Sequence, residues 1–321
     1  MVFSTFFVYY TSQAIQHRPW YLNTIQDTSF SYHNKCTLIS IAQAIKHCVA
    51  FTKNLLSHTT YQSIKKEIAQ KRLDIKNAYL TKEKQALKQL GISIRFSQEQ
   101  WACCLHAIDE IKKIALENMQ KPHDHAQNNQ SIPKKLKNIL YGFLQKNHIN
   151  PYSIQFSFVK TKENIDIFAY TSANMFLSYD YENGMLLQAP YISHEIVIYE
   201  HMSQQPKSHQ LAFLAHEVEH LCQQHNITTL VLEDYVKSYC MQLNDLHKNE
   251  DFKKLLIIHE EQAEIFAALK DPRVAQALVD LRATHFYPNH LYEAHYHDLV
   301  EINNIWKIEK LVDKIKITGF N

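Results

Sequence analysis

One stretch, Gln210-Leu-Ala-Phe-Leu-Ala-His216-Glu217-Val-Glu-His220-Leu-Cys-Gln-Gln-His225, carries the pattern on which the fold prediction depends. It predicts one amphipathic helix that contains the sequence H-E-x-x-H. Its apolar residues recur at helical spacing and form a buried stripe: Leu211, Leu214, Val218 and Leu221. A site on this helix would need further residues from the rest of the chain.

The spacing within the motif suits a metal ion. His216 and His220 stand four residues apart, so both imidazoles project from one face of a helix and can bind the same ion. Glu217 lies one step round the helix from His216, beside that ion, where it could take a proton from a metal-bound water. The motif alone can also arise by chance in a chain with 20 histidines.

A third ligand is available downstream. The stretch Glu260-Glu-Gln-Ala-Glu264-Ile-Phe-Ala267 lies on a predicted helix, with Glu260 and Glu264 on one face. Glu260 could coordinate the ion, and Glu264 could accept the second ring N–H of a ligating histidine. Glu261 is an alternative third ligand, because the phase of a predicted helix is uncertain by about one residue.

Neighbouring polar residues are given more ordinary roles. We expect Glu219 to face solvent and His225 to pack near the C-terminal end of the motif helix. We expect His259 only to flank the site, and Cys222 and Cys240 to belong to the core.

A small sheet is predicted directly before the motif helix. Apolar and β-branched residues suggest strands over residues 152–159, 165–170, 175–179, 185–188 and 194–199. Asn183-Gly184 between two of these runs predicts a hairpin. We expect a mostly antiparallel sheet of four or five strands, whose edge strand could hold an extended peptide by main-chain hydrogen bonds.

Helices are predicted on both sides of this region. Before it, they cover about residues 37–56, 61–90, 97–119 and 134–146. Gly91 is expected to end the second, and Ser97 with Gln100 forms a capping box for the third. After it, they cover about residues 230–246 (capped by Thr228 or Thr229), 252–269 (capped by Asn249 or Asp251), 272 onward and 291–317. The fold class is therefore α+β, with a helical N-terminal region at 1–130 and a second domain at 131–321.

Composition narrows the function classes. The formal net charge of +2 over 321 residues indicates no nucleic-acid partner, and four glycines supply no phosphate-binding loop. The six cysteines form no C-x-x-C pair. We expect no transmembrane segment and no signal peptide, hence a soluble protein that is cytoplasmic or exported without a cleavable signal.

The motif stretch together with Glu260–Ala267 resembles the gluzincin pattern of the zinc-dependent CAAX prenyl endopeptidases and the HtpX-type membrane proteases. The resemblance covers about residues 150–300 and implies a zincin-like metallopeptidase domain. It also implies one Zn²⁺ per chain, held by His216, His220 and Glu260, with Glu217 as general base. Two features depart from the family: Glu264 stands where those proteins have aspartate, and their transmembrane helices are missing here.

The family's later His-Pro element is matched only loosely, by Thr284-His-Phe-Tyr-Pro-Asn-His290. Within it, His285, Tyr287 or His290 is a candidate for stabilising the oxyanion of a tetrahedral intermediate. The sequence does not choose among the three.

The predicted function is that of a zinc-dependent metalloendopeptidase whose partner is a protein or peptide substrate. Two alternatives remain open: a catalytically inactive binding protein with the same fold, and a metal-dependent hydrolase of non-peptide substrates. The oligomeric state and the role of the N-terminal helices are not predicted.

Overall fold

The computed structural model describes residues 58–121, 132–160, 167–284 and 293–319. The chain divides into two compact units, and the larger, residues 65–310, contains every element discussed below apart from the outer ends of two helices. The predicted helix at 37–56 lies outside the described residues. The predicted domain boundary falls at residues 122–131, which also lie outside them.

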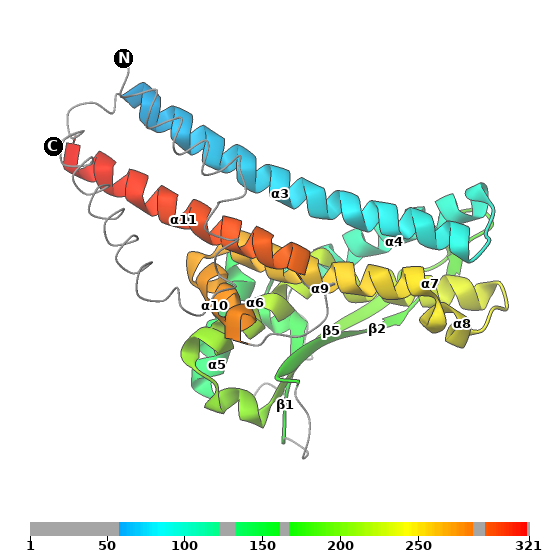
Figure 1. Ribbon diagram of the computed structural model, residues 1–321. Coiled ribbons are helices and arrows are strands. Elements are labelled where there is room, and N and C mark those ends of the chain that lie inside the picture. Colours follow the sequence, from blue (N-terminus) through cyan, green and yellow to red (C-terminus); the bar gives the residue numbers. More distant parts are fainter. Residues whose placement is uncertain (1–57, 122–131, 161–166, 285–292, 320–321) are drawn as a thin grey trace. The chain divides into compact units, whose positions relative to one another are not determined.

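In the described residues before the sheet, the helices are α3 (His58–Ser93), α4 (Gln98–Gln120) and α5 (Lys134–Lys146) (Figure 1). The capping box of α4 is confirmed, since Ser97 and Gln100 bond reciprocally. The prediction that Gly91 ends α3 is wrong, because the helix continues through it. A side chain at Gly91 would lie 2.5 Å from the ring of Trp101, so close packing between α3 and α4 explains the glycine.

The described strands that follow are short: β1 (Ile154–Val159), β2 (Ala169–Phe176), β3 (Tyr179–Asp180), β4 (Met185–Leu186) and β5 (Tyr191–Tyr199). The predicted hairpin is confirmed as β3–β4, which form a separate two-stranded sheet. The expected single, mostly antiparallel sheet is wrong. The main sheet has three strands in the order β1-β5-β2, with β1 parallel and β2 antiparallel to β5.

The motif helix is α6 (Lys207–Gln223), reached from β5 through a short 3-10 turn. The residue after it, Gln224, caps the helix with a left-handed φ of 56°, and α7 (His225–Ser238) begins directly after Gln224. The prediction that the helix after the motif begins at Thr228 or Thr229 and extends to residue 246 is therefore wrong, because α7 begins at His225 and ends at Ser238. A separate helix, α8 (Leu243–Lys248), occupies that segment.

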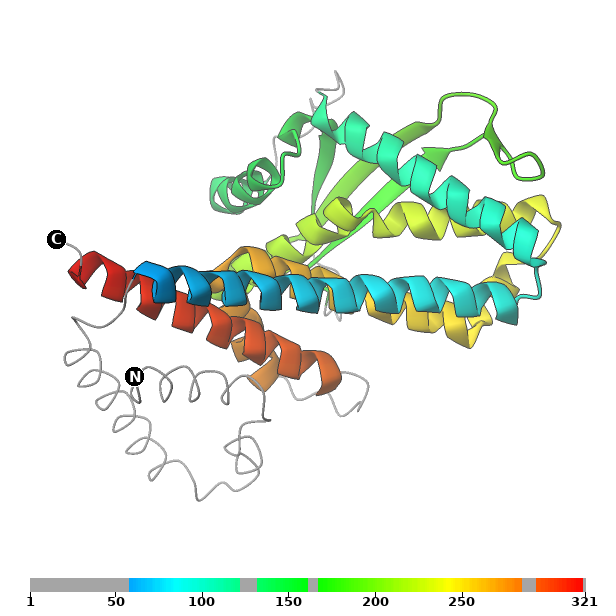
Figure 2. The same ribbon diagram turned by 90° about the horizontal axis from the view of Figure 1, so that it is seen from above.

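The remaining helices are α9 (Glu250–Lys270), α10 (Pro272–Thr284) and α11 (Glu293–Gly319). Asn249 caps α9 through its side chain, and Pro272 opens α10, as predicted. Figures 1 and 2 show α3 running alongside α9. Between these two helices, Gln262 donates a hydrogen bond to the backbone of Tyr79.

Among the described residues, two clusters of buried apolar side chains form the core of the larger unit. The side chains of the first cluster come mainly from α5, α6, α9, α10 and the main sheet. Those of the second come mainly from α3, α4, α7 and the start of α9. Helices from both sides of residues 122–131 thus contribute to shared cores. The face of α6 that carries the motif packs against α9. No helix in the described part of the chain is long and apolar enough to cross a membrane.

Candidate metal centre

The motif histidines and the predicted third ligand converge on one point. His216 Nε2 lies 2.9 Å from His220 Nε2 and 3.1 Å from Glu260 Oε2. His220 Nε2 lies 3.4 Å from Glu260 Oε1. Helix α6 brings the two imidazoles together because they are one turn apart, and α9 packs beside α6 and supplies the carboxylate.

These separations fit a single tetrahedral ion. Two ligands with bonds of about 2.0–2.1 Å to a tetrahedral zinc lie about 3.3 Å apart. The two imidazole nitrogens lie 2.9 Å apart, and each lies 3.1 or 3.4 Å from the Glu260 oxygen that faces it, so these separations bracket this value. Two imidazoles and one carboxylate are a catalytic zinc donor set that leaves a fourth position open. Glu260 is 56% exposed at its side chain, so solvent reaches this carboxylate.

Electrostatics bind the three groups together. Burial lowers the pKa of His216, but the hydrogen bond and charge of Glu260 outweigh burial and raise this pKa to about 9. Although the Glu260 side chain is 56% exposed, the protein atoms around its carboxylate raise its pKa, and its bonds to His216 and His220 outweigh this effect and hold the pKa well below its usual range. A cation at this point would compete with the proton that the pair shares.

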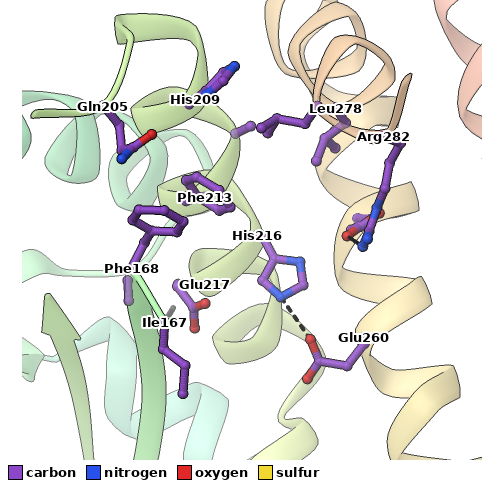
Figure 3. Close-up of a pocket in the computed structure, with 14 residues that line it drawn as sticks. Ile167, Phe168, Gln205, His209, Phe213, His216, Glu217, Glu260, Leu278 and Arg282 are labelled. Carbon is purple, nitrogen blue, oxygen red and sulfur yellow. Dashed lines mark hydrogen bonds and ion pairs between the residues drawn. The ribbon is translucent and has the colours of Figure 1, made fainter. Parts of the chain in front are cut away.

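Glu217 stands on the side of α6 that faces β2 (Figure 3). Thr171 of β2 donates to the Oε2 atom of Glu217 at 2.8 Å and lies 3.0 Å from its backbone carbonyl. The hydroxyl holds one carboxylate oxygen, which leaves the other to meet a reacting molecule. Sequence reasoning did not identify Thr171, because nothing local marks a strand residue 46 positions before its partner.

A cavity of about 310 Å³ opens beside the ligands. His216, Glu217 and Glu260 line it, and Figure 3 shows these residues at one end with aromatic rings above them. Phe168 and Phe213 stack with their ring centroids 4.7 Å apart. The wall is thus largely apolar next to the polar site.

The inner end of β2 borders this cavity. The carbonyl of Phe168 accepts from the N–H of Tyr199 on β5, so by antiparallel alternation Ala169 and Thr171 direct their backbone groups to the opposite edge. At Thr171 that edge is covered, because Asn226 of α7 donates to its carbonyl at 2.9 Å. Ala169 lines the cavity, so its outward backbone groups are the ones available there.

Glu264 has different partners from those expected. Its carboxylate binds the guanidinium of Arg282 and lies 3.1 Å from Nε2 of His295, rather than accepting from a ligating histidine. Burial raises its pKa, but His295 and Arg282 outweigh burial and lower it to about 2. Glu261, the alternative third ligand, lies 3.7 Å from Lys82 and is not in the ligand group.

The expectation for Glu219 is corrected, whereas His225 packs at the C-terminal end of α6 as expected. Glu219 is 2% exposed and bonds the ammonium of Lys270 at 2.6 and 2.7 Å, because α9 and α10 cover that side of α6. His225 is the first residue of α7 and lies with Nδ1 2.9 Å from Nδ1 of His220. Burial holds the pKa of His225 well below its usual value. His285, Tyr287 and His290 lie outside the described residues.

Comparison with known protein families, with curated proteins and with solved structures found no match.

Proposed function

We propose that the chain is a zinc-dependent metalloendopeptidase. The observation that carries the proposal is the convergence of His216, His220 and Glu260, with separations suited to one tetrahedral ion. Among the described residues, these three are the one group of His, Cys, Asp or Glu side chains close enough together to hold an ion. The family resemblance of the motif stretch leads to the same proposal and stays a prediction.

The residues divide the work between them. His216, His220 and Glu260 would hold the ion, which when bound acts as a Lewis acid toward a carbonyl oxygen and a water molecule. Glu217 takes a proton from the attacking water and later delivers one to the leaving amine. Thr171 keeps the carboxylate of Glu217 aimed at the cavity through its 2.8 Å hydrogen bond.

An extended peptide suits the surroundings of these groups. The outward N–H and C=O groups of Ala169 can pair with a substrate main chain, and the rings of Phe168 and Phe213 offer an apolar wall to one side chain. Because Asn226 covers the edge at Thr171, this pairing is confined to the end of β2 near the ligands.

The test combines metal analysis with peptide cleavage. Purified protein is analysed for bound metal, and cleavage of a mixed peptide library is followed by mass spectrometry. We expect one zinc per chain and cleavage that stops when a chelator is added and returns with zinc. Glu217→Gln is the matched variant, because it keeps the side-chain shape and the three ligands. It should bind zinc as the wild type does and cleave nothing.

The alternatives give different results. Zinc binding without cleavage of any peptide would indicate a binding protein or a hydrolase of other substrates, and the peptidase proposal would then be wrong. Cleavage that persists in Glu217→Gln would overturn the role of this glutamate.

A further inference from the structure

A buried chain of hydrogen bonds extends from the candidate metal centre away from the cavity. His220 Nδ1 lies 2.9 Å from His225 Nδ1, and His225 Nε2 lies 2.8 Å from Gln262 Oε1. Gln262 Nε2 then lies 3.2 Å from Glu83 Oε2 and 2.9 Å from the carbonyl oxygen of Tyr79. The chain joins α6, α7, α9 and α3.

The far end of this chain accepts hydrogen bonds and cannot donate them. Glu83 is 8% exposed and faces Lys112, 3.1 Å away on α4, and His259, 3.5 Å away on α9. Burial raises the pKa of Glu83, but His259 and Lys112 outweigh burial and lower it to about 2, so the group is a carboxylate. A carboxylate and a backbone carbonyl are both acceptors only. Gln262 must therefore turn its NH₂ group toward Glu83 and Tyr79.

This orientation fixes every hydrogen along the chain. The amide oxygen of Gln262 faces His225, so His225 Nε2 must carry the proton and donate it. In the neutral ring Nδ1 is then the acceptor, and it accepts from His220 Nδ1–H. His220 is left with its lone pair on Nε2, the atom that faces His216 and Glu260.

We propose that Glu83, acting through Gln262 and His225, is a positioning residue that sets the tautomer of His220 for metal binding; this inference rests on the proposed metal centre. A ligating histidine usually donates its second N–H to a carboxylate or a carbonyl, whose polarity is fixed. Here the partner is another imidazole, which can donate or accept. The direction must therefore be supplied from further away, and the Glu83 carboxylate supplies it together with the backbone carbonyl of Tyr79.

Replacing one atom of Glu83 should reverse the direction. In Glu83→Gln the amide oxygen would face the Lys112 ammonium and the NH₂ group would face Gln262. The amide of Gln262 then has two arrangements. It can keep its bond to Tyr79 while its NH₂ group faces the NH₂ group of the new side chain, or it can turn over and present its NH₂ group to His225. The first arrangement sets two NH₂ groups against each other and leaves the proton positions on His225 and His220 unchanged, so we expect Gln262 to turn over. Its NH₂ group then donates to His225 and favours a proton on Nε2 of His220, where it blocks a metal ion.

The experiment measures zinc affinity by competition with a chromophoric chelator. Glu83→Gln should weaken zinc binding by about 10–100-fold, the usual effect of removing a group behind a metal ligand. Glu83→Asp keeps an acceptor but shortens the side chain. If polarity matters it should bind zinc more tightly than Glu83→Gln, whereas a role in shape alone gives the opposite order. Gln262→Met is a second variant that interrupts the chain at another helix, and it should also weaken zinc binding.

Glu219→Gln is the matched control. Glu219 is a buried carboxylate on the motif helix that pairs with Lys270 of α9, and it takes no part in the hydrogen-bond chain from His220 to Glu83. It should bind zinc as the wild type does. Equal weakening in this control, or wild-type affinity in both Glu83→Gln and Gln262→Met, would overturn the inference and leave the proposed function standing. Absence of zinc binding by the wild-type protein would overturn both.

Discussion

Two glycines that both lie within helices should respond in opposite ways to replacement by alanine. Gly91 is in the last turn of α3, and a Cβ there would lie 2.5, 2.5 and 2.6 Å from three ring atoms of Trp101. Gly142 lies in the middle of α5, and a Cβ there would meet nothing within 4 Å. The same substitution thus tests packing at one site and helix propensity at the other.

The magnitudes follow from these contacts. Ordinary contact begins near 3.4 Å, so in Gly91→Ala the ring of Trp101 must move by nearly 1 Å. This ring is 6% exposed and packs against Phe96 and Tyr235, which limits its movement. Overpacking costs up to about 3 kcal/mol, and the gain in helix propensity offsets about 1 kcal/mol, so the net loss is about 2 kcal/mol. Gly142→Ala should gain about 0.5–1 kcal/mol.

Thermal unfolding followed by circular dichroism measures both changes. At about 2–4 °C per kcal/mol for a unit of this size, Gly91→Ala should lower Tm by about 4–8 °C, and Gly142→Ala should raise it by about 1–4 °C. A Tm for Gly91→Ala equal to or above that of the wild type would refute the assignment of Gly91 to helix packing. A loss of stability in both variants would show that the contacts around Trp101 do not explain the difference.

Further predictions concern the site and its surroundings. Lys270→Met should destabilise the fold by about 3 kcal/mol in urea unfolding, because it leaves the buried carboxylate of Glu219 without its cation, whereas Lys253→Met, which breaks an exposed pair, should change stability by less than about 0.5 kcal/mol. Thr171→Val should keep zinc and lower kcat for peptide cleavage by about tenfold, since one hydrogen bond of about 1.4 kcal/mol to Glu217 is lost, and Thr171→Ser should retain most of the activity; equal rates for both variants would contradict the role of the hydroxyl. The folded pKa of Glu264, about 2, lies below its ordinary value of 4.5, so its contribution to stability is complete above pH 4.5 and is lost as the pH falls toward 2; Glu264→Gln should flatten this part of an acid-unfolding curve, and an unchanged slope would contradict the contribution. Saturating zinc should raise Tm of the wild type and not of Glu260→Ala, because only a folded state with all three ligands gains the binding free energy.

The sequence predicted those parts of the site that depend on local order. The spacing of His216 and His220 fixes their shared helix face whatever the rest of the chain does. Glu260 was proposed as the third ligand with Glu261 as the alternative, and the structure places Oε2 of Glu260 3.1 Å from Nε2 of His216. The capping box at Ser97 likewise involves residues three apart, and it is present as predicted.

The errors arose where distant residues decide the local conformation. Glycine is common at helix ends, but at position 91 it lies inside α3 because Trp101 of the next helix leaves no room for a side chain. Gln224 adopts a left-handed conformation that glycine usually takes, and nothing in its neighbours marks this turn. The parallel pairing of β1 with β5 joins strands about 40 residues apart and leaves no periodic signal. The contact between Glu83 and Gln262 was not predicted at all, since no sequence pattern links these two residues.

The wide spacing of the contributing segments has a consequence for folding. Glu83 precedes Gln262 by 179 positions, and His216 precedes Glu260 by 44. During synthesis the motif helix leaves the ribosome before α9, so its imidazoles emerge without the carboxylate or the amide that orients them. Contacts of such long range form late in folding. Zinc is therefore expected to bind after α3 and α9 have met, and it should slow unfolding of the finished protein more than it speeds refolding.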